Sequence, residues 1–103
     1  AVQGQEPVDI FAAPGQSDLS SHVDFAALVC DLACKHSRLT PQGLFLERLE
    51  ITQRANTLAE YLTDDALKMH IAAHRRLTHP DEMGSLFKVL SFYPTYTPIP
   101  AGF

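Results

Sequence analysis

Several features that would classify this chain directly are scarce in its sequence. The longest apolar run, Phe25 to Cys30, is stopped by Asp31, whereas a transmembrane helix needs about 20 apolar residues in succession. Basic charge is low as well: 8 Lys and Arg against 12 Asp and Glu leave a net charge of −4, which argues against nucleic acid as the main partner. The sequence contains no catalytic fingerprint and no repeat, so we expect a chain that is not an enzyme and uses no cofactor.

Cysteine is also scarce. Cys30 and Cys34 are the only two, and they lie four residues apart in a stretch with helical character, a poor geometry for a disulfide between them. Two thiols without a disulfide framework are typical of a reducing compartment. The opening residues, Ala1 to Gly4, show neither an initiator Met nor the basic and apolar regions of a signal peptide. We therefore expect a cytoplasmic protein.

What is present fits one globular domain. The chain has 103 residues, of which 46% are hydrophobic and 19% charged. Prolines collect near both ends and predict an extended acidic arm over 1–18, a helical domain over 19–93 and an extended tail over 94–103. Residues 1–34 hold five acids and neither Lys nor Arg. This acidic stretch is either a solvated segment or one that steers the chain toward a basic partner surface.

The spacing of apolar residues predicts an all-α fold of three to four helices. The first helix is expected over 21–38, the second over 41–62 and the third over 65–77. Residues 81–92 are expected to form the fourth, because their two-on, one-off apolar pattern is closer to a helical period than to strict alternation. A short strand over 86–93 remains the alternative for this segment.

The C-terminal segment carries the strongest functional signal. From Leu86 to Phe103 a single charge, Lys88, stands among many apolar and aromatic residues. A helix that is apolar on nearly all sides must be covered on more than one side, either by the chain's own tail or by another protein, a second copy included. We predict a homodimer and a protein-binding surface made of Leu86, Phe87, Leu90, Phe92, Tyr93 and Tyr96, with Ile10 and Phe11 as helpers.

Metal binding is the main alternative from a different class. Cys30 and Cys34 are spaced for one helix face, and so are His70 and His74. If the two helices packed together, the four side chains would form a Cys₂His₂ zinc site. The bland interpretation is that the cysteines are small apolar residues and the histidines lie at the surface. A DNA-binding helix-turn-helix is weaker still, because few basic residues stand near its second helix.

The chain as a whole resembles the short bacterial anti-activator proteins of the QslA type, which bind LuxR-type quorum-sensing activators. The resemblance lies in small size, acidic character, helical layout, two thiols and an aromatic tail. It implies a dimeric helical protein that binds an activator's ligand-binding domain and blocks its dimerisation. We therefore expect a non-enzymatic transcription regulator that occludes a partner protein and makes no direct contact with nucleic acid or membrane.

Overall fold

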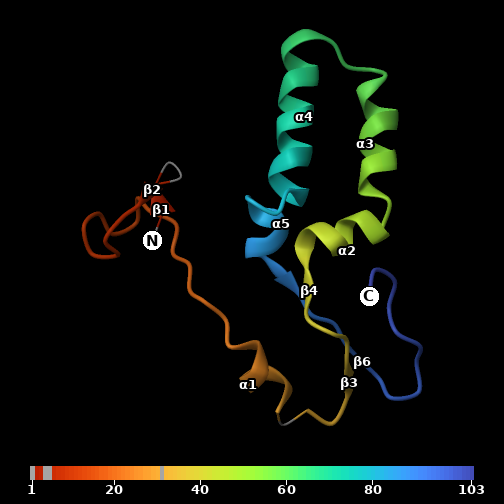
Figure 1. Ribbon diagram of the computed structural model, residues 1–103. Helices are drawn as coiled ribbons and strands as arrows, with labels where there is room; N and C mark the ends of the chain where they lie inside the picture. Colours follow the sequence, from red (N-terminus) through yellow and green to blue (C-terminus); the bar gives the residue numbers. More distant parts are fainter. Residues whose placement is uncertain (1, 4–5, 31) are drawn as a thin grey trace. The chain divides into compact units, whose positions relative to one another are not determined.

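A computed structural model describes residues 2–3, 6–30 and 32–103 (Figure 1). They belong to two compact units, residues 1–30 and residues 31–103. The all-α prediction is wrong, because the described residues form a mixed α/β structure with 41% helix and 12% strand. The strands are short and antiparallel, and each pairs with one other strand.

The first unit contains little regular structure. Strands β1 (Val2–Gln3) and β2 (Glu6–Pro7) pair with each other, and helix α1 spans Phe25–Val29. Asp24 caps α1, because its Oδ1 accepts a hydrogen bond of 3.0 Å from the Ala27 N–H. The predicted helix over 21–38 is therefore wrong outside α1: it begins later, ends before Cys30, and its last expected turn is a strand of the second unit.

Two short antiparallel strand pairs belong to the second unit. Strand β3 (Lys35–His36) pairs with β6 (Phe92–Tyr93), and β4 (Thr40–Pro41) pairs with β5 (Lys88–Val89). The register places three residues, 37–39, opposite two, 90–91, which is a one-residue bulge. Ser37 holds the bulge, since its N–H donates to the Ser91 carbonyl and its Oγ accepts from the Ser91 N–H, both at 2.9 Å. We call residues 35–41 and 88–93 together the ribbon.

The ribbon explains why the fourth predicted helix is wrong. Only α5 (Met83–Leu86) is helical in the segment 81–92, and β5 and β6 follow it. Their partners lie about fifty positions earlier in the chain, so the pairing is a long-range effect that local periodicity does not report. The strand alternative for 86–93 is the one that the structure shows for four of these residues.

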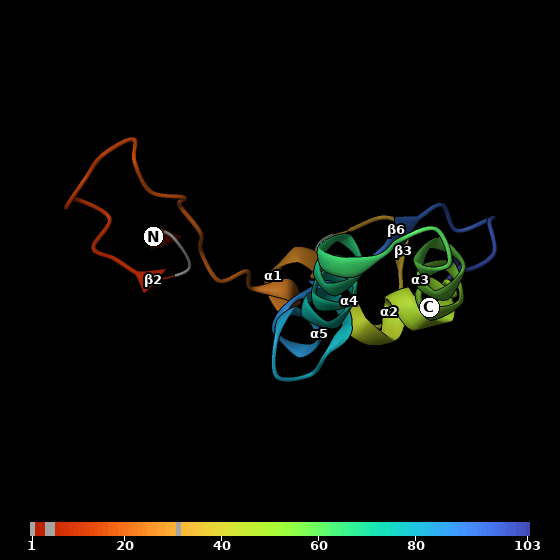
Figure 2. The same ribbon diagram turned by 90° about the horizontal axis from the view of Figure 1, so that it is seen from above.

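Helices α2 to α5 come between β4 and β5 along the chain. The predicted second helix is wrong as one element: it is split into α2 (Gln42–Arg48) and α3 (Ile51–Ala59) by Glu50, which adopts a left-handed φ of 64°. The third predicted helix is confirmed as α4 (Asp64–Thr78), with Asp64 and Asp65 in its first turn and Arg75 and Arg76 in its last. Two views show α3 and α4 running side by side as a hairpin (Figures 1 and 2).

A close backbone crossing joins the two ends of this helical segment. Gly43 on α2 and Gly84 on α5 are both buried, and both face the carbonyl group of Thr78 at the end of α4. A Cβ atom at Gly43 would overlap the Thr78 oxygen and lie 3.3 Å from the Cα of Gly84. Only glycine lets three backbone segments approach this closely.

The described part of the chain buries few side chains. Among these residues the fully buried polar ones are Ser37 and Thr40, and no hydrophobic side chain reaches the same degree of burial. Large apolar side chains such as Tyr61 (81% exposed), Met69 (73%) and Ile71 (58%) face outward on the α3–α4 hairpin. Within the described range, no helix combines the length and the apolar character that a membrane span requires.

Candidate functional site

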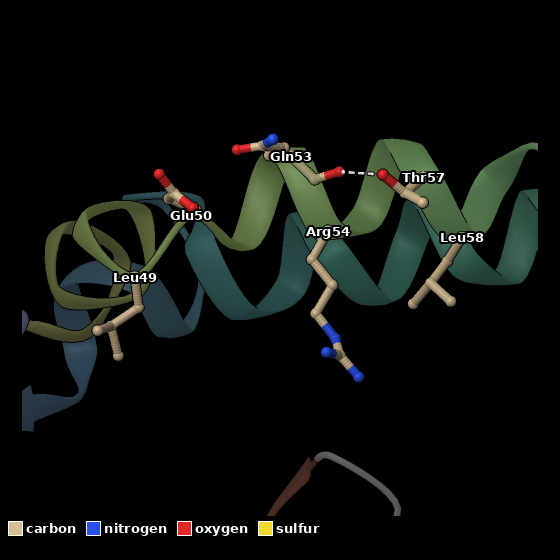
Figure 3. A pocket seen from close by; sticks show the side chains of 6 residues that line it. All are labelled: Leu49, Glu50, Gln53, Arg54, Thr57 and Leu58. Carbon is tan, nitrogen blue, oxygen red and sulfur yellow. Dashed lines mark hydrogen bonds between the residues drawn. The ribbon is translucent and has the colours of Figure 1, made fainter.

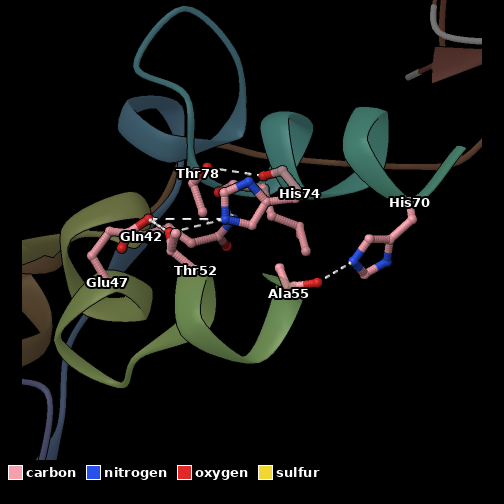
Figure 4. A network of polar contacts seen from close by, with 8 residues as sticks. Gln42, Glu47, Thr52, Ala55, His70, His74 and Thr78 are labelled. Atoms are coloured by element: carbon pink, nitrogen blue, oxygen red, sulfur yellow. Dashed lines mark hydrogen bonds and ion pairs between the residues drawn. The ribbon is translucent and has the colours of Figure 1, made fainter. Parts of the chain in front are cut away.

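A polar network joins α2, α3 and α4 on one face of the second unit (Figure 4). The Thr52 hydroxyl donates to Glu47 Oε1 at 2.6 Å, and it lies 3.2 Å from His74 Nε2. His74 Nε2 is also 4.0 Å from the same carboxylate oxygen. One acidic, one hydroxyl and one imidazole side chain, each from a different helix, therefore meet at one point.

The hydrogen-bond directions in this network indicate how it acts. A hydroxyl has one proton to donate, and the Thr52 proton is directed at Glu47. In the second contact His74 Nε2 must therefore be the donor, and its N–H donates to the Thr52 oxygen. Because the imidazole does not accept the hydroxyl proton, Thr52 is not activated as a nucleophile. The network joins helices and does not form a hydrolytic triad.

Neighbouring contacts support the same interpretation. His70 Nε2 donates to the Ala55 carbonyl oxygen at 2.9 Å, which ties α4 to α3. At the other end of α4, Gln42 Nε2 donates to the Leu77 carbonyl oxygen at 2.9 Å, which ties α4 to α2. These backbone carbonyls belong to two different helices, so the contacts fix how the helices pack.

Two hollows flank α3. The smaller, about 180 Å³, lies between α3 and α4 and is lined by Ile51, Arg54, Ala55, Leu58, His70, Ala73, His74 and Leu77. The larger, about 450 Å³, is an open depression lined by Leu49, Glu50, Gln53, Arg54, Thr57 and Leu58. Arg54 belongs to both, and its side chain projects away from α3 (Figure 3). An open depression of this kind is better suited to contact with another protein surface than to a reaction that must be shielded from water.

The residues predicted to bind a partner are distributed over both units. Ile10 and Phe11 lie in the first unit, 51% and 80% exposed. The others lie in the second unit, where Leu86 ends α5 and Phe92 and Tyr93 form β6. Tyr96 is 88% exposed, whereas Leu90 and Tyr93 are half-buried. Leu86, Phe87 and Phe92 are also exposed, and their role in binding stays a prediction.

The Cys₂His₂ metal site is not formed. No group of three potential metal ligands occurs among the described residues. The reason is local: Cys30 follows the end of α1 and Cys34 precedes β3, so the two thiols do not share a helix face. His70 and His74 are committed to Ala55 and Thr52. Both cysteines are free thiols.

The network of Glu47, Thr52 and His74 was not anticipated from the sequence. Glu47 and Thr52 are five residues apart, and they become neighbours because Glu50 turns the chain between α2 and α3. His74 comes from 22 positions further along. No spacing rule for a single helix brings these three together, and a break at a non-glycine residue leaves no strong sequence signal.

Comparison with known proteins finds similarity to one group of enzymes. No protein-family model matches the chain. The chain is 31% identical over 91 residues to the mitochondrial protein arginine methyltransferase NDUFAF7 homolog of Drosophila melanogaster. It is 34% and 32% identical, each over 89 residues, to the mitochondrial protein arginine methyltransferases NDUFAF7 of Xenopus laevis and Bos taurus. These matches cover 84% of this chain and 20–21% of the relatives, so the chain spans about a fifth of their length.

These similarities correct the functional expectations. The relatives are named as methyltransferases and not as anti-activators, so the QslA-type resemblance, the quorum-sensing and bacterial assignment, and the occlusion of a transcription activator are wrong. The expectation of a non-enzymatic class is overturned for the same reason. Size, acidity and an aromatic tail are properties that unrelated proteins share, and no motif stood behind the resemblance.

Proposed function

We propose that this chain acts as part of a protein methyltransferase similar to NDUFAF7, in which it supplies a binding and packing surface and not the methyl-transfer chemistry. The observation that carries the proposal is the 31–34% identity along 84% of the chain. The match extends over only about a fifth of each relative. A shared segment of this size can contribute to such an enzyme, but most residues of the enzyme lie outside the segment.

The exposed apolar surface supports a packing role. The chain is 46% hydrophobic, yet its described part has no fully buried hydrophobic side chain. A folded domain normally places Leu, Ile and Phe inside, and large exposed apolar patches mark interaction surfaces. Leu58, Ile71 and Leu77 on the α3–α4 hairpin are 45%, 58% and 38% exposed. Contact with the remainder of a methyltransferase would remove this area from water and stabilise the fold.

The similarity to the relatives and the state of the cysteines also bear on the compartment in which the chain works. The relatives are named as mitochondrial proteins, and the two thiols are free. We propose that the chain works where thiols stay reduced, which includes the predicted cytoplasmic location.

A chimeric enzyme tests the proposed function. In the Drosophila relative, the region that matches this chain is deleted or is replaced by residues of this chain. Methyl transfer from tritiated S-adenosylmethionine to arginine is then measured in a fly mitochondrial extract. The deletion should abolish transfer, the chimera should restore it, and a chimera with a shuffled segment of the same composition should not. The 103-residue chain alone should transfer no methyl groups.

Two results would contradict the proposal. One is a chimera that melts at the temperature of the parent enzyme but transfers no methyl groups, because the segment would then fold without contributing. The other is a deletion variant with full activity, because the segment would then be dispensable.

A further inference from the structure

A third hollow lies on the ribbon side of the second unit, apart from the network and from α3. Its volume is about 410 Å³, within the range of about 300–1,000 Å³ that is typical of small-molecule sites. It is formed by the bulge and β4, by α2 and by the C-terminal residues. The residues that line it are Arg38, Leu39, Thr40, Pro41, Leu44, Arg48, Ile99 and Phe103.

The walls of this hollow are held by specific contacts. Thr40 is 4% exposed, and its hydroxyl donates to the Arg38 carbonyl oxygen at 3.1 Å. The Phe103 ring packs on Phe45, with ring centroids 5.1 Å apart and tilted by 44°. Arg48 Nη1 donates to the Gly102 carbonyl oxygen at 3.4 Å. Phe45 and Arg48 on α2 therefore hold the C-terminal residues beside the strand and helix that form the rest of the hollow.

The charged side chains that line the hollow are both basic. Arg38 and Arg48 are its charged lining residues, and no carboxylate side chain lines it. In the described part of the chain neither guanidinium forms an ion pair; the pairs there belong to Lys68, His74, Arg75 and His79. A guanidinium matches the geometry of carboxylate and phosphate oxygens.

We propose that this hollow binds a small anionic amphiphile. Its single anionic head, a carboxylate or a phosphate, accepts hydrogen bonds from Arg38 and Arg48. Its short apolar part covers Leu44, Ile99 and Phe103, of which Leu44 and Ile99 are 47% and 51% exposed without it. The head compensates the two positive charges, and the apolar part removes hydrophobic surface from water.

Titration of the full chain with octanoate tests this site. Calorimetry should show one octanoate per chain, and octyl phosphate should bind at the same place, because both heads suit a guanidinium. Arg38→Gln and Arg48→Gln should each weaken octanoate binding by about tenfold or more, since each removes a charged hydrogen bond. Arg76→Gln, an exposed arginine on α4 outside the hollow, is the matched control and should leave the affinity within about twofold.

Two further ligands separate the head from the apolar part. Octanol lacks the charge and inorganic phosphate lacks the apolar part, so both should bind far more weakly than octanoate. Arg48 also holds Gly102, and Arg38→Gln therefore tests the charge without disturbing the tail. Circular dichroism of each variant confirms that it is folded.

The proposal is overturned by any of four results. These are no octanoate binding up to millimolar concentration, equal binding by wild type and Arg38→Gln, octanol binding as tight as octanoate binding, and phosphate binding as tight as octanoate binding.

Discussion

Replacing Gly84 by alanine tests the close crossing of α2, α4 and α5. The added Cβ would overlap the Thr78 carbonyl oxygen, and it would lie 2.5 Å from the Thr78 carbonyl carbon and 2.7 Å from the His79 oxygen. All three atoms belong to the backbone, so no side chain can rotate away to make room. The backbone of α5 must shift from α4, which separates it from Gly43 on α2 as well.

The size of the effect follows from these contacts. Overpacking costs about 1–3 kcal/mol where side chains can adjust, and contact with backbone atoms places Gly84→Ala at the upper end, about 3 kcal/mol. In a domain of 60–100 residues each kcal/mol lowers the melting temperature by about 4–8 °C. We therefore expect the melting temperature to decrease by about 12–24 °C, which circular dichroism of the helices would measure.

A matched control lies one residue further along the chain. Ser85→Ala changes the same helix without adding an atom at the crossing, and alanine is the better helix former. Its melting temperature should stay within about 2 °C of the wild type. A Gly84→Ala variant that melts as the wild type does would refute the crossing, because the added Cβ would then have found space.

Three other substitutions test single features. Thr52→Val removes the hydroxyl between Glu47 and His74 and should lower the free energy of unfolding, measured by urea titration, by about 1 kcal/mol. The control Thr57→Val removes a hydroxyl that contacts its own helix at the surface and should lower it by less than about 0.5 kcal/mol. Equal losses would contradict the role of the network. Glu50→Gly should raise the melting temperature by about 4–8 °C, because glycine avoids the roughly 1 kcal/mol penalty of a left-handed φ; Glu50→Ala keeps the Cβ and should show no gain. Glu82→Gln breaks an exposed ion pair with Arg75 and should lower the free energy of unfolding by less than about 1 kcal/mol. The difference between variant and wild type should disappear in high salt. An equal loss at all salt concentrations would show that the pair does not act through its charges.

Helix α4 could be predicted because every local signal agreed. Two acids open it, Arg75 and Arg76 stand in its last turn, and apolar residues recur along one face. The expected boundaries, 65–77, differ by one residue at each end from those observed. Local sequence is sufficient where helix formation depends on a single segment.

The breaks and the ribbon could not be predicted in the same way. Leu49 and Ile51 continue the apolar pattern across Glu50, so the left-handed turn there is invisible to periodicity. Each of the strands β3 to β6 has two residues, and the helical segment α2 to α5 separates each strand from its partner along the sequence. Val89, Phe92 and Tyr93 are residue types that favour strands, and this was the one usable signal.

The candidate sites depended on the same long-range contacts. Arg38 and Arg48 stand ten positions apart, and the tail completes the hollow that they line by returning to α2. Leu86 and Tyr96 stand in an apolar, almost uncharged part of the sequence, and both side chains are exposed in the structure. Their exposure depends on which segments pack beside them, and adjacent residues in the sequence do not determine that packing.

The ribbon also makes the helical segment separable. Pro41 and Lys88 are direct partners across the two strands, so the chain leaves the ribbon for α2 to α5 and returns beside the point of departure. Insertions and deletions within 42–87 therefore leave the strand register unchanged. A two-residue Asn-Gly turn joining Pro41 to Lys88 would close the ribbon into a simple hairpin. The two ends of the helical segment thus lie side by side, and a chain without these helices would also lose the contacts of Phe45 and Arg48 that hold the C-terminal residues.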